Sequence, residues 1–415
     1  MKRRNVIFAL VFCLIVSCLA ACGLTVLQGQ NNSETASSGA AGETVASAES
    51  DAVPAVTTAY TGSGSVLDTS DLFTERDLTQ TADLSEAVTL EVSDGEDLVI
   101  TEEGVYVISG TAEEATIIVE ADDAAKVQLV LSDLTLTNSD FPCIYVKEAD
   151  KVFVTLEGEN ELSVTGTFTA DGSINTDGVI FSRSDLVLNG TGSLTIASTE
   201  NGIVGKDDLK VTGGTYVITA ASKTIEANDS IRIADGSFIL TAGTDALHAE
   251  NDDDDTLGYI YIGGGEFTID AGDDGIHGTS IVQIDDGSLT ISAAEGIEGT
   301  VIQINGGSTA IAASDDGINA AQKSDSYSIS LEITGGELTV DMGQGDTDAI
   351  DSNGDLTISG GTITITAQSP FDCDGTISWT GGTVIVNGQE VTSIENQMMG
   401  GPMGGGFGGG FGGRR

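Results

Sequence analysis

Apolar and polar residues alternate in short runs along most of this chain. The run Thr-Ile-Thr-Ile-Thr at residues 362–366 is one example, and Gly, Asn and Asp separate such runs from one another. Alternation with a period of two over so few residues, rich in β-branched side chains, predicts strands with one buried face. The pattern therefore predicts an all-β protein.

The alternating runs are copies of one phrase, exemplified by VTGGTYVITA and ISGGTITITA, with an aligned Gly in each copy. Successive aligned glycines lie 22, 29, 22, 20, 29, 25 and 21 residues apart. About 22 residues suffice for three short strands and three turns, which form one coil of a right-handed parallel β-helix with a continuous apolar core. A leucine-rich repeat would show a Leu and Asn signature, and a β-sandwich would not repeat one phrase eight times. The aligned glycines are Gly214, Gly236, Gly265, Gly287, Gly307, Gly336, Gly361 and Gly382.

The N-terminal segment has the composition of an export signal. The basic residues 2–4 precede an apolar run over residues 6–19, and Leu-Ala-Ala-Cys follows at residues 19–22. This ending resembles the bacterial lipobox, so we expect residues 1–22 to be a lipoprotein signal with Cys22 as the lipidated residue. An ordinary or uncleaved signal peptide is the alternative, although the run is shorter than the ~20 residues of a membrane span. The protein is expected to be exported and anchored to the outer face of the bacterial cell membrane.

The mature chain divides into three parts by composition. Residues 23–66 are mostly small and polar and predict a disordered tether, whereas residues 67–395 predict the β-helix with an N-terminal cap over its open end. Residues 396–415 form a Gly-rich tail that cannot build a core. We expect Cys143 and Cys373 to be buried thiols rather than a disulfide, and the protein to be a monomer.

The chain is strongly acidic. Its 65 Asp and Glu against 15 Lys and Arg give a formal charge of -50, which argues against a nucleic-acid partner. Only 2 His residues are present, which leaves little material for His-based catalysis. Adaptation to high salt would scatter the acids over the surface, but many of them recur at a fixed place in the repeat. That regularity favours cation binding or surface chemistry.

The recurring acids lie in a turn between strand phrases, as in DDGIHGT at 273–279 and AEGIEGT at 294–300. A second polar position follows three residues later and holds His248, His277 or Asn319 in some copies. If the coils stack in register, each position becomes a column of side chains. The residues predicted to bind a cation are Asp245, Asp274, Glu295, Glu298, Asp316, Asp348 and Asp351.

Stacked carboxylates repel one another. Neighbouring coils lie ~4.8 Å apart, and two carboxylates at about 5 Å repel by about 3 kcal/mol at an effective dielectric of 20. Ca²⁺ would relieve this repulsion because it accepts six to eight oxygen ligands. The alternative for any single Asp is an ordinary turn residue that bonds the local backbone. The two His could suggest Zn²⁺ or Ni²⁺, but oxygen donors dominate.

Several phrases resemble one known family. GVYVISGT (104–111), CIYVKEADKVFVTLEGEN (143–160) and GYIYIGGGEFTI (258–269) are similar to the carbohydrate-binding β-helix family of bacterial cell-surface proteins. The resemblance covers about residues 85–390 and implies a pectate-lyase-like parallel β-helix with bound Ca²⁺. It also implies binding of plant cell-wall polysaccharide, cellulose or acidic pectin, without established lyase activity. By motif position the family's acidic turns correspond to Asp245, Asp274, Asp316 and Asp348.

The sequence leaves three functions open. A non-catalytic binder of cell-wall polysaccharide would use Ca²⁺ for acidic sugars, and Tyr259, Tyr261 and Trp379 as candidate stacking platforms for neutral ones, with aromatic packing as the alternative for each ring. A structural or adhesive stalk would bind no saccharide. A Ca²⁺-dependent pectate lyase would need a basic residue to abstract a proton. The candidate bases are Lys206, Lys210, Lys223 and Arg232, although isolated basic residues on a coil are more often solvated.

Overall fold

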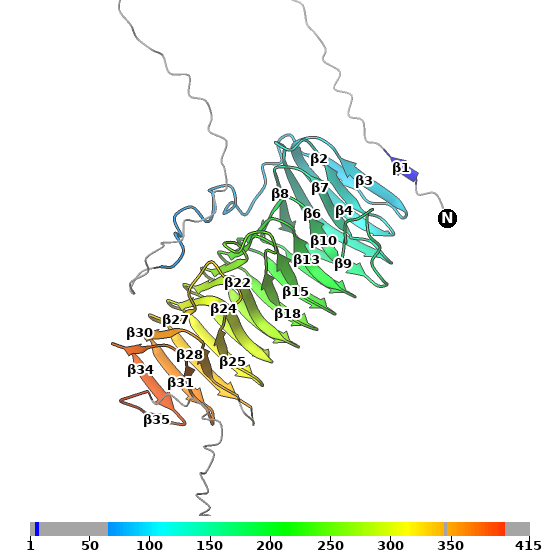
Figure 1. The fold of residues 1–415 in the computed structure, drawn as a ribbon. Coiled ribbons are helices and arrows are strands. Elements are labelled where there is room, and N and C mark those ends of the chain that lie inside the picture. Colours follow the sequence, from blue (N-terminus) through cyan, green and yellow to red (C-terminus); the bar gives the residue numbers. More distant parts are fainter. Residues whose placement is uncertain (1–4, 8–64, 344–346, 395–415) are drawn as a thin grey trace, which may run out of the picture.

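The strands wind into a column of stacked coils. The computed structural model describes residues 5–7, 65–343 and 347–394, and the coils follow one another from β2 and β4 at one end to β34 and β35 at the other (Figure 1). Each complete coil contributes one strand segment to each of three parallel sheets, which we call sheets 1, 2 and 3. The predicted parallel β-helix is therefore confirmed.

Sheet 1 begins with the first strands of the solenoid and continues to its last coil. Four of its strands are long enough to turn a corner and enter a second sheet. Its members are β2 (Val88–Glu91), β4 (Gly104–Glu113), β6 (Lys126–Asn138), β8 (Lys151–Glu157), β11 (Asp185–Gly190), β14 (Asp208–Val211), β17 (Ser230–Ile233), β20 (Tyr259–Ile262), β22 (Asp274–Ile284), β24 (Glu295–Ile304), β27 (Ser330–Ile333), β30 (Asp355–Ile358) and β33 (Ile377–Trp379).

Sheet 2 follows sheet 1 in every coil, and the second parts of β4 and β6 belong to it. The short β35 pairs antiparallel with β34 at the C-terminal end. The members are β9 (Glu159–Val164), β12 (Ser193–Ser198), β15 (Thr215–Ala220), β18 (Ser237–Ala242), β21 (Glu266–Ala271), β23 (Ser288–Ala293), β25 (Ser308–Ala313), β28 (Glu337–Met342), β31 (Thr362–Thr366), β34 (Thr383–Val386) and β35 (Gln389–Glu390).

Sheet 3 completes the coil and includes the first parts of β22 and β24. β1, from the expected export signal, pairs parallel with β3 at one end. The members are β1 (Asn5–Ile7), β3 (Glu96–Ile100), β5 (Ile117–Glu120), β7 (Ile144–Glu148), β10 (Gly178–Ser182), β13 (Asn201–Gly205), β16 (Ile225–Ala227), β19 (Leu247–Ala249), β26 (Ile318–Ala320), β29 (Ile350–Ser352) and β32 (Asp372–Cys373).

The core is a stack of like side chains. In β15, β18 and β21 exposed and buried residues alternate along the strand, as the sequence pattern predicts. Because identical positions lie in register, Tyr216, Phe238 and Phe267 form an aromatic stack inside sheet 2, with ring centroids 5.2 and 4.5 Å apart. The periodicity of the sequence thus becomes a continuous column of apolar contacts.

The aligned glycines lie at the corner before each strand of sheet 2. All eight have a positive φ, which only Gly adopts without strain. At Gly361, for example, φ is 79°, and a Cβ atom would lie 2.7 Å from the carbonyl oxygen of Gly335 in the coil below. The repeated Gly therefore reflects both a left-handed backbone and close contact between coils.

Residues 65–80, which we call the strap, lie along the outer face of sheet 1. The backbone N–H of Val66 donates to the side chain of Gln303, and the side chain of Gln80 bonds Thr212, several coils away. We expected Leu67 onward to cover the open end and residue 66 to belong to the tether. Instead the strap covers the outer face of sheet 1, where it buries apolar side chains and pairs with charged ones. The end of the solenoid is formed by β2 and β3.

The two cysteines of the solenoid were predicted to be unpaired and buried. Cys143 and Cys373 are both buried, and the described residues contain no disulfide, as expected. Burial raises the pKa of the Cys143 thiol to about 12. In the described residues no helix is long and apolar enough to cross a membrane.

Removing a ring from the aromatic stack should destabilise the fold. Phe238 is 1% exposed, whereas the next residue, Ile239, is 51% exposed on the opposite face of the same strand. We expect Phe238→Ala to lower the free energy of unfolding by about 3–5 kcal/mol through the cavity it leaves. Ile239→Ala is the matched control and should cost less than ~1 kcal/mol. Chemical denaturation measures both, and equal losses would contradict the assignment of the two faces.

Candidate functional site

The recurring polar residues form two rows along sheet 3. We call the first the strand row, because strand pairing places its members side by side on consecutive coils. We call the second the turn row, because each member lies three residues before the strand-row position of its own coil, which is Val204 in the case of Asn201. The strand row contains Glu226, His248, His277, Glu298, Asn319, Asp351 and Asp372. The turn row contains Asn201, Lys223, Asp245, Asp274, Glu295, Asp316 and Asp348.

All seven predicted cation ligands lie in these two rows. Glu298 and Asp351 are in the strand row, and the other five are in the turn row. Sequence reasoning missed Glu226 and Asp372 as members of the strand row. Lys223 and Ser369 replace the acid three residues before Glu226 and Asp372, so the turn motif is hard to recognise at either place. Glu226 directly follows Ile225, which is aligned with Ile203 and Leu247 in sheet 3, so counting from this apolar position would have identified it.

The turn row is held partly by backbone hydrogen bonds between coils. The backbone N–H of Asp274 donates to Oδ1 of Asp245 at 3.2 Å, and that of Asp348 donates to Oδ1 of Asp316 at 3.1 Å. The N–H of Lys223 donates to Oδ1 of Asn201 at 3.0 Å in the same way. These oxygens therefore accept backbone hydrogen bonds as ordinary turn residues do, which was the alternative to cation binding. The remaining polar atoms are used within the rows, since Oδ2 of Asp245 lies 2.8 Å from Nδ1 of His248 and the amide nitrogen of Asn201 donates to Glu226 at 3.1 Å.

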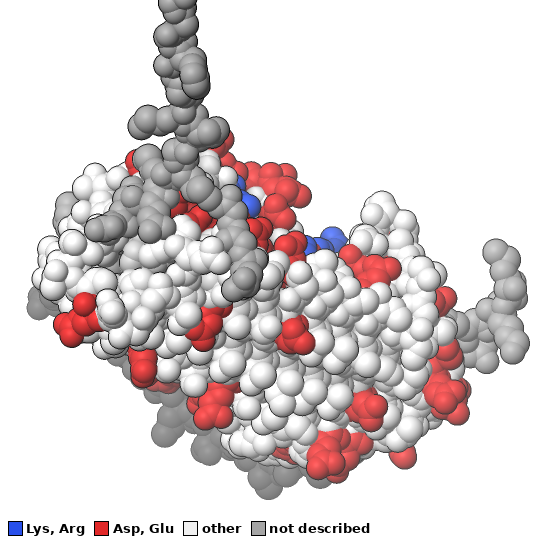
Figure 2. All heavy atoms as spheres, turned by 90° about the horizontal axis from the view of Figure 1, so that it is seen from below, with Lys and Arg blue, Asp and Glu red and all other residues white. Residues whose placement is uncertain are grey.

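Cationic side chains are interleaved with the acids at the N-terminal half of the rows. Lys206 and Lys223 lie 3.0 and 3.6 Å from the carboxylate of Glu226. On the next coil, Nδ1 of His248 lies 2.8 Å from Asp245. On the surface seen in Figure 2, the few visible Lys and Arg side chains likewise lie beside Asp and Glu. Like-charge repulsion is therefore offset here by the protein's own cations.

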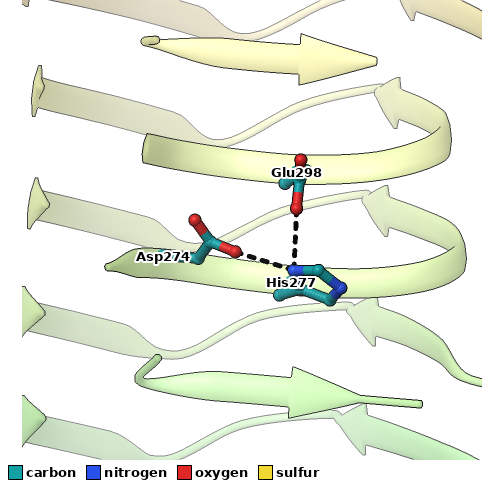
Figure 3. A group of neighbouring side chains, drawn as sticks. All are labelled: Asp274, His277 and Glu298. Carbon is teal, nitrogen blue, oxygen red and sulfur yellow. Dashed lines mark hydrogen bonds and ion pairs between the residues drawn. The ribbon is translucent and has the colours of Figure 1, made fainter. Parts of the chain in front are cut away.

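The tightest group in the rows is Asp274, His277 and Glu298. Nδ1 of His277 lies 2.7 Å from Asp274 on the same strand and 2.9 Å from Glu298 on the next coil (Figure 3). Of the residues described, these three form the one group of acids, His or Cys whose possible ligand atoms all lie within 4.8 Å of one another. The ring of His277 also stacks on that of His248, with centroids 4.7 Å apart.

A proton stabilises this group. Burial disfavours the imidazolium, but the hydrogen bonds and negative charges of Asp274 and Glu298 outweigh burial and raise the pKa of His277 to about 9. Burial raises the pKa of Glu298, but hydrogen bonds from His277 and Lys323 lower it more, and the net shift is downward. The group is thus an ion triad at neutral pH, and Lys323, whose Nζ lies 2.7 Å from Glu298, supplies the second positive charge for its two carboxylates.

The C-terminal half of the rows is different, because acids accumulate there. Burial and then neighbouring carboxylates raise the pKa of Asp316 to about 6 and that of Asp351 to about 7. Burial likewise raises the pKa of Glu295 to about 7, against a hydrogen bond from Asn319. Within the described part of the chain, neither Asp316 nor Asp351 forms an ion pair with a Lys, Arg or His.

These observations bear on the predicted cation ligands. Carboxylates that form no ion pair with a Lys, Arg or His of the described residues suit Ca²⁺, and Asp316 and Asp351 meet that description better than the triad does. Asp348 precedes Asp351 by three residues, and its Oδ1 accepts a hydrogen bond from the hydroxyl of Ser369. Glu295 lies one coil from Asp316 in the turn row. Asp274 and Glu298 do not fit as well, because His277 already holds them, and Asp245 is held by His248.

Two of the three predicted aromatic platforms are not open to solvent. Tyr259 is 2% exposed and Tyr261 is 8% exposed, because the strap covers both rings. The expectation of stacking surfaces at these two positions is therefore corrected, since a covered ring cannot lie against a sugar. Trp379 is half-buried against the core, its indole N–H donates to the carbonyl oxygen of Gly381 at 2.7 Å, and a stacking role for it stays a prediction.

The four candidate bases fall on two different sheets. Lys206 and Lys223 lie beside the rows of sheet 3, where both pair with Glu226. Lys210 and Arg232 lie side by side on sheet 1 beneath the strap and are almost fully buried. Only the first two can meet a ligand on the polar rows.

Removing His277 should make stability depend differently on pH. Its folded pKa of about 9 exceeds the ordinary value of 6.5, so the stabilisation is complete below pH 6.5 and is lost as the pH rises through 9. His277→Gln should lower the free energy of unfolding by on the order of 2–3 kcal/mol at pH 6. The gap between variant and parent should close by about pH 10 in denaturant titrations. A gap of the same size at both pH values would contradict the ion triad.

Comparison with known proteins identifies a family whose model matches the chain. A model of the family described as "Carbohydrate-binding domain-containing protein" matches residues 94–347. A relative of that description from Acetivibrio thermocellus is 34% identical over 128 residues, which are 29% of this chain and 44% of the relative. The chain thus matches less than half the length of that relative.

Among solved structures, a polysaccharide lyase-like protein from C. thermocellum, determined as a gadolinium derivative, is similar to the chain. The similarity covers 73% of this chain and 94% of that protein, with 23% identity and a TM-score of 0.41.

Proposed function

Because the chain belongs to the family of carbohydrate-binding domain-containing proteins, we propose that it binds an acidic cell-wall polysaccharide along the polar rows of sheet 3 without catalysis. The observation that carries this proposal is the register of the rows. They present a charged group on every coil at a spacing of ~4.8 Å over many coils. A long polymer with repeating charges is the ligand that such a periodic surface suits best.

The two halves of the rows would take different parts in binding. At the N-terminal half, Lys206 and Lys223 are partly exposed and can meet uronate carboxylates through charge-assisted hydrogen bonds. At the C-terminal half, an acidic polymer would be repelled unless a cation intervened. Neutral cellulose is less well suited, because two of the three predicted aromatic platforms, Tyr259 and Tyr261, are covered.

Calcium is the cation that the acidic half would hold. Asp316, Asp348 and Asp351 would be its protein ligands, with Glu295 near by. Bound there, Ca²⁺ would neutralise the stacked carboxylates and could share its remaining positions with uronate oxygens. The raised pKa values of Asp316 and Asp351 support this proposal, since they record the repulsion that a cation would relieve.

We also propose that the protein acts outside the cell on a lipid anchor at Cys22. The lipobox-like residues 19–22 and the small polar residues after them support this. Cys22 and the tether up to residue 64 lie outside the described residues.

A lyase is the second candidate, because Lys206 and Lys223 lie beside the proposed site. In the present geometry both ammonium groups pair with Glu226, at 3.0 and 3.6 Å, so a carboxylate of the protein already occupies the groups that a lyase would direct at its substrate. The measurements that follow separate the two functions.

Binding is tested by a pull-down on insoluble polygalacturonate. We expect retention of the parent chain, and loss of affinity by about tenfold in Lys206→Gln combined with Lys223→Gln, which corresponds to about 1.4 kcal/mol of lost charge pairing. Lys126→Gln is the matched control, since Lys126 pairs with Asp150 away from the rows, and it should bind as the parent does. Higher salt should weaken the interaction.

Two outcomes of that experiment would contradict the proposal. Retention on neither polygalacturonate nor cellulose would favour a stalk. Growth of unsaturated-uronate absorbance in the same samples, abolished by the Lys206 and Lys223 substitutions, would make the protein a lyase.

Calcium removal is tested by thermal unfolding. Ca²⁺ at a hundredfold excess over Kd should stabilise the parent by about 2.7 kcal/mol, because it binds the folded state. The melting temperature should therefore rise. Asp316→Asn with Asp351→Asn should lose this response, yet melt no lower than the parent in chelator because like charges have been removed. Asp235→Asn with Asp286→Asn, two exposed turn acids elsewhere, is the control. Identical melting of the parent in calcium and in chelator would disprove the calcium site.

A further inference from the structure

The strap is fixed to sheet 1 at two places. Near its end, Asp77 is fully buried, with its carboxylate oxygens 3.8 Å from Nζ of Lys151 and 3.4 Å from Nζ of Lys210. The carbonyl oxygen of the same Asp77 accepts a 2.5 Å hydrogen bond from Thr212. A single acidic residue of the strap is thus enclosed by two buried lysines from different coils.

At its start, the strap lies on amide and aromatic side chains. Gln303 accepts the backbone N–H of Val66 at 2.9 Å, and Gln283 accepts that of Leu67 at 2.8 Å. Leu67 belongs to an apolar cluster with Tyr259 and Tyr261 that is separate from the core of the solenoid. The strap therefore spans the coils from β24 to β8, six steps of ~4.8 Å or about 29 Å.

The side chains beneath the strap form two neighbouring columns. In one, strand pairing places Lys210, Arg232, Tyr261, Gln283 and Gln303 side by side on consecutive coils. The other contains Lys151, Asp208 and Tyr259, and Asp208 pairs with Arg232 at 2.5 Å. Basic groups bind carboxylates, aromatic rings stack on sugars, and amides bond hydroxyl groups. The corresponding outward column of sheet 2, which no segment of the described residues covers, carries mostly short side chains instead, among them Thr268, Thr290 and Thr364.

Simple docking of a segment would not require this chemistry. Replacing buried ion pairs by apolar contacts is often neutral or stabilising, so stability alone does not account for the buried charges on this face. Residues 65–80 form no strand, and the strands of sheet 1 pair with one another from coil to coil without them. The strap could leave this face without breaking the backbone ladder of the solenoid.

We propose that the covered face of sheet 1 is a second saccharide site, for a uronate-bearing chain, and that the strap occupies it as an internal stand-in. The carboxylate of Asp77 takes the place of a uronate carboxylate between Lys151 and Lys210. The backbone of residues 66 and 67 takes the place of sugar hydroxyl groups on the two glutamines. Polysaccharide binds here only when the strap leaves, so the strap lowers the apparent affinity of this face. The inference rests on the proposed class of ligand but concerns a different sheet.

The test uses the full chain with a weakened strap, Leu67→Ser, Leu72→Ser and Asp77→Asn. Affinity for soluble polygalacturonate should rise by about tenfold, since the fraction of molecules with an open site increases. Adding Lys210→Gln should abolish the gain, and a neutral soluble glucan should show no comparable gain. The matched control is Asp68→Asn with Leu78→Ser, two exposed strap residues, which should bind as the parent does.

Hydrogen exchange reports whether the strap has left. The amides of Val66 and Leu67 should exchange faster in the weakened variant, while those of β17 and β20 stay protected. A released strap with unchanged affinity would overturn the proposal. An equal gain for the neutral glucan would overturn the assignment of a carboxylate ligand.

Two results would show that the strap is part of the fold instead. One is loss of protection in β17 and β20 of the weakened variant together with unchanged affinity in Asp77→Asn alone. The other is loss of cooperative unfolding in Asp77→Asn itself. Failure of the sheet 3 site is distinguishable, because Lys206→Gln with Lys223→Gln affects that site, whereas Lys210→Gln in the parent chain should not.

Discussion

Backbone hydrogen bonds between successive coils determine nearly every other property of this protein. Each strand pairs in parallel with the equivalent strand of the next coil, so equivalent positions lie ~4.8 Å apart along the whole solenoid. Because of this register, an apolar residue that recurs at one position packs on its equivalents in the neighbouring coils, as in the stack of Tyr216, Phe238 and Phe267. An acid that recurs at one turn position is likewise placed next to its equivalents, and their negative charges repel.

The protein manages that repulsion in two ways. In the N-terminal half of the polar rows, Lys and His residues alternate with acids, and backbone N–H groups from the next coil occupy one oxygen of residues such as Asp245. In the C-terminal half no such cations accompany Asp316 and Asp351 among the residues described, and the repulsion is expressed as raised pKa values. The surface therefore changes from a balanced to an acidic character along one axis.

The repeat allowed the fold and the two rows to be predicted from sequence alone. The period, the aligned glycines and the three-residue offset between Asp274 and His277 are local features, and register converts them directly into spatial neighbours. The strap could not be predicted this way, since its contacts with Gln283 and Gln303 depend on residues more than 200 positions away. Tyr259 and Tyr261 were placed wrongly as open platforms for the same reason: the alternating pattern identifies an outward face but not what covers it.

The strap also has a consequence for the order of folding. In a solenoid each coil contacts only its neighbours, so coils can add to a growing stack one after another. Val66, however, bonds Gln303, which lies 237 residues later in the chain. The strap is synthesised before any coil, but its N-terminal anchor can dock only after β24 has formed. Docking of the strap is therefore a late step, completed only when the coils from β8 to β24 have stacked.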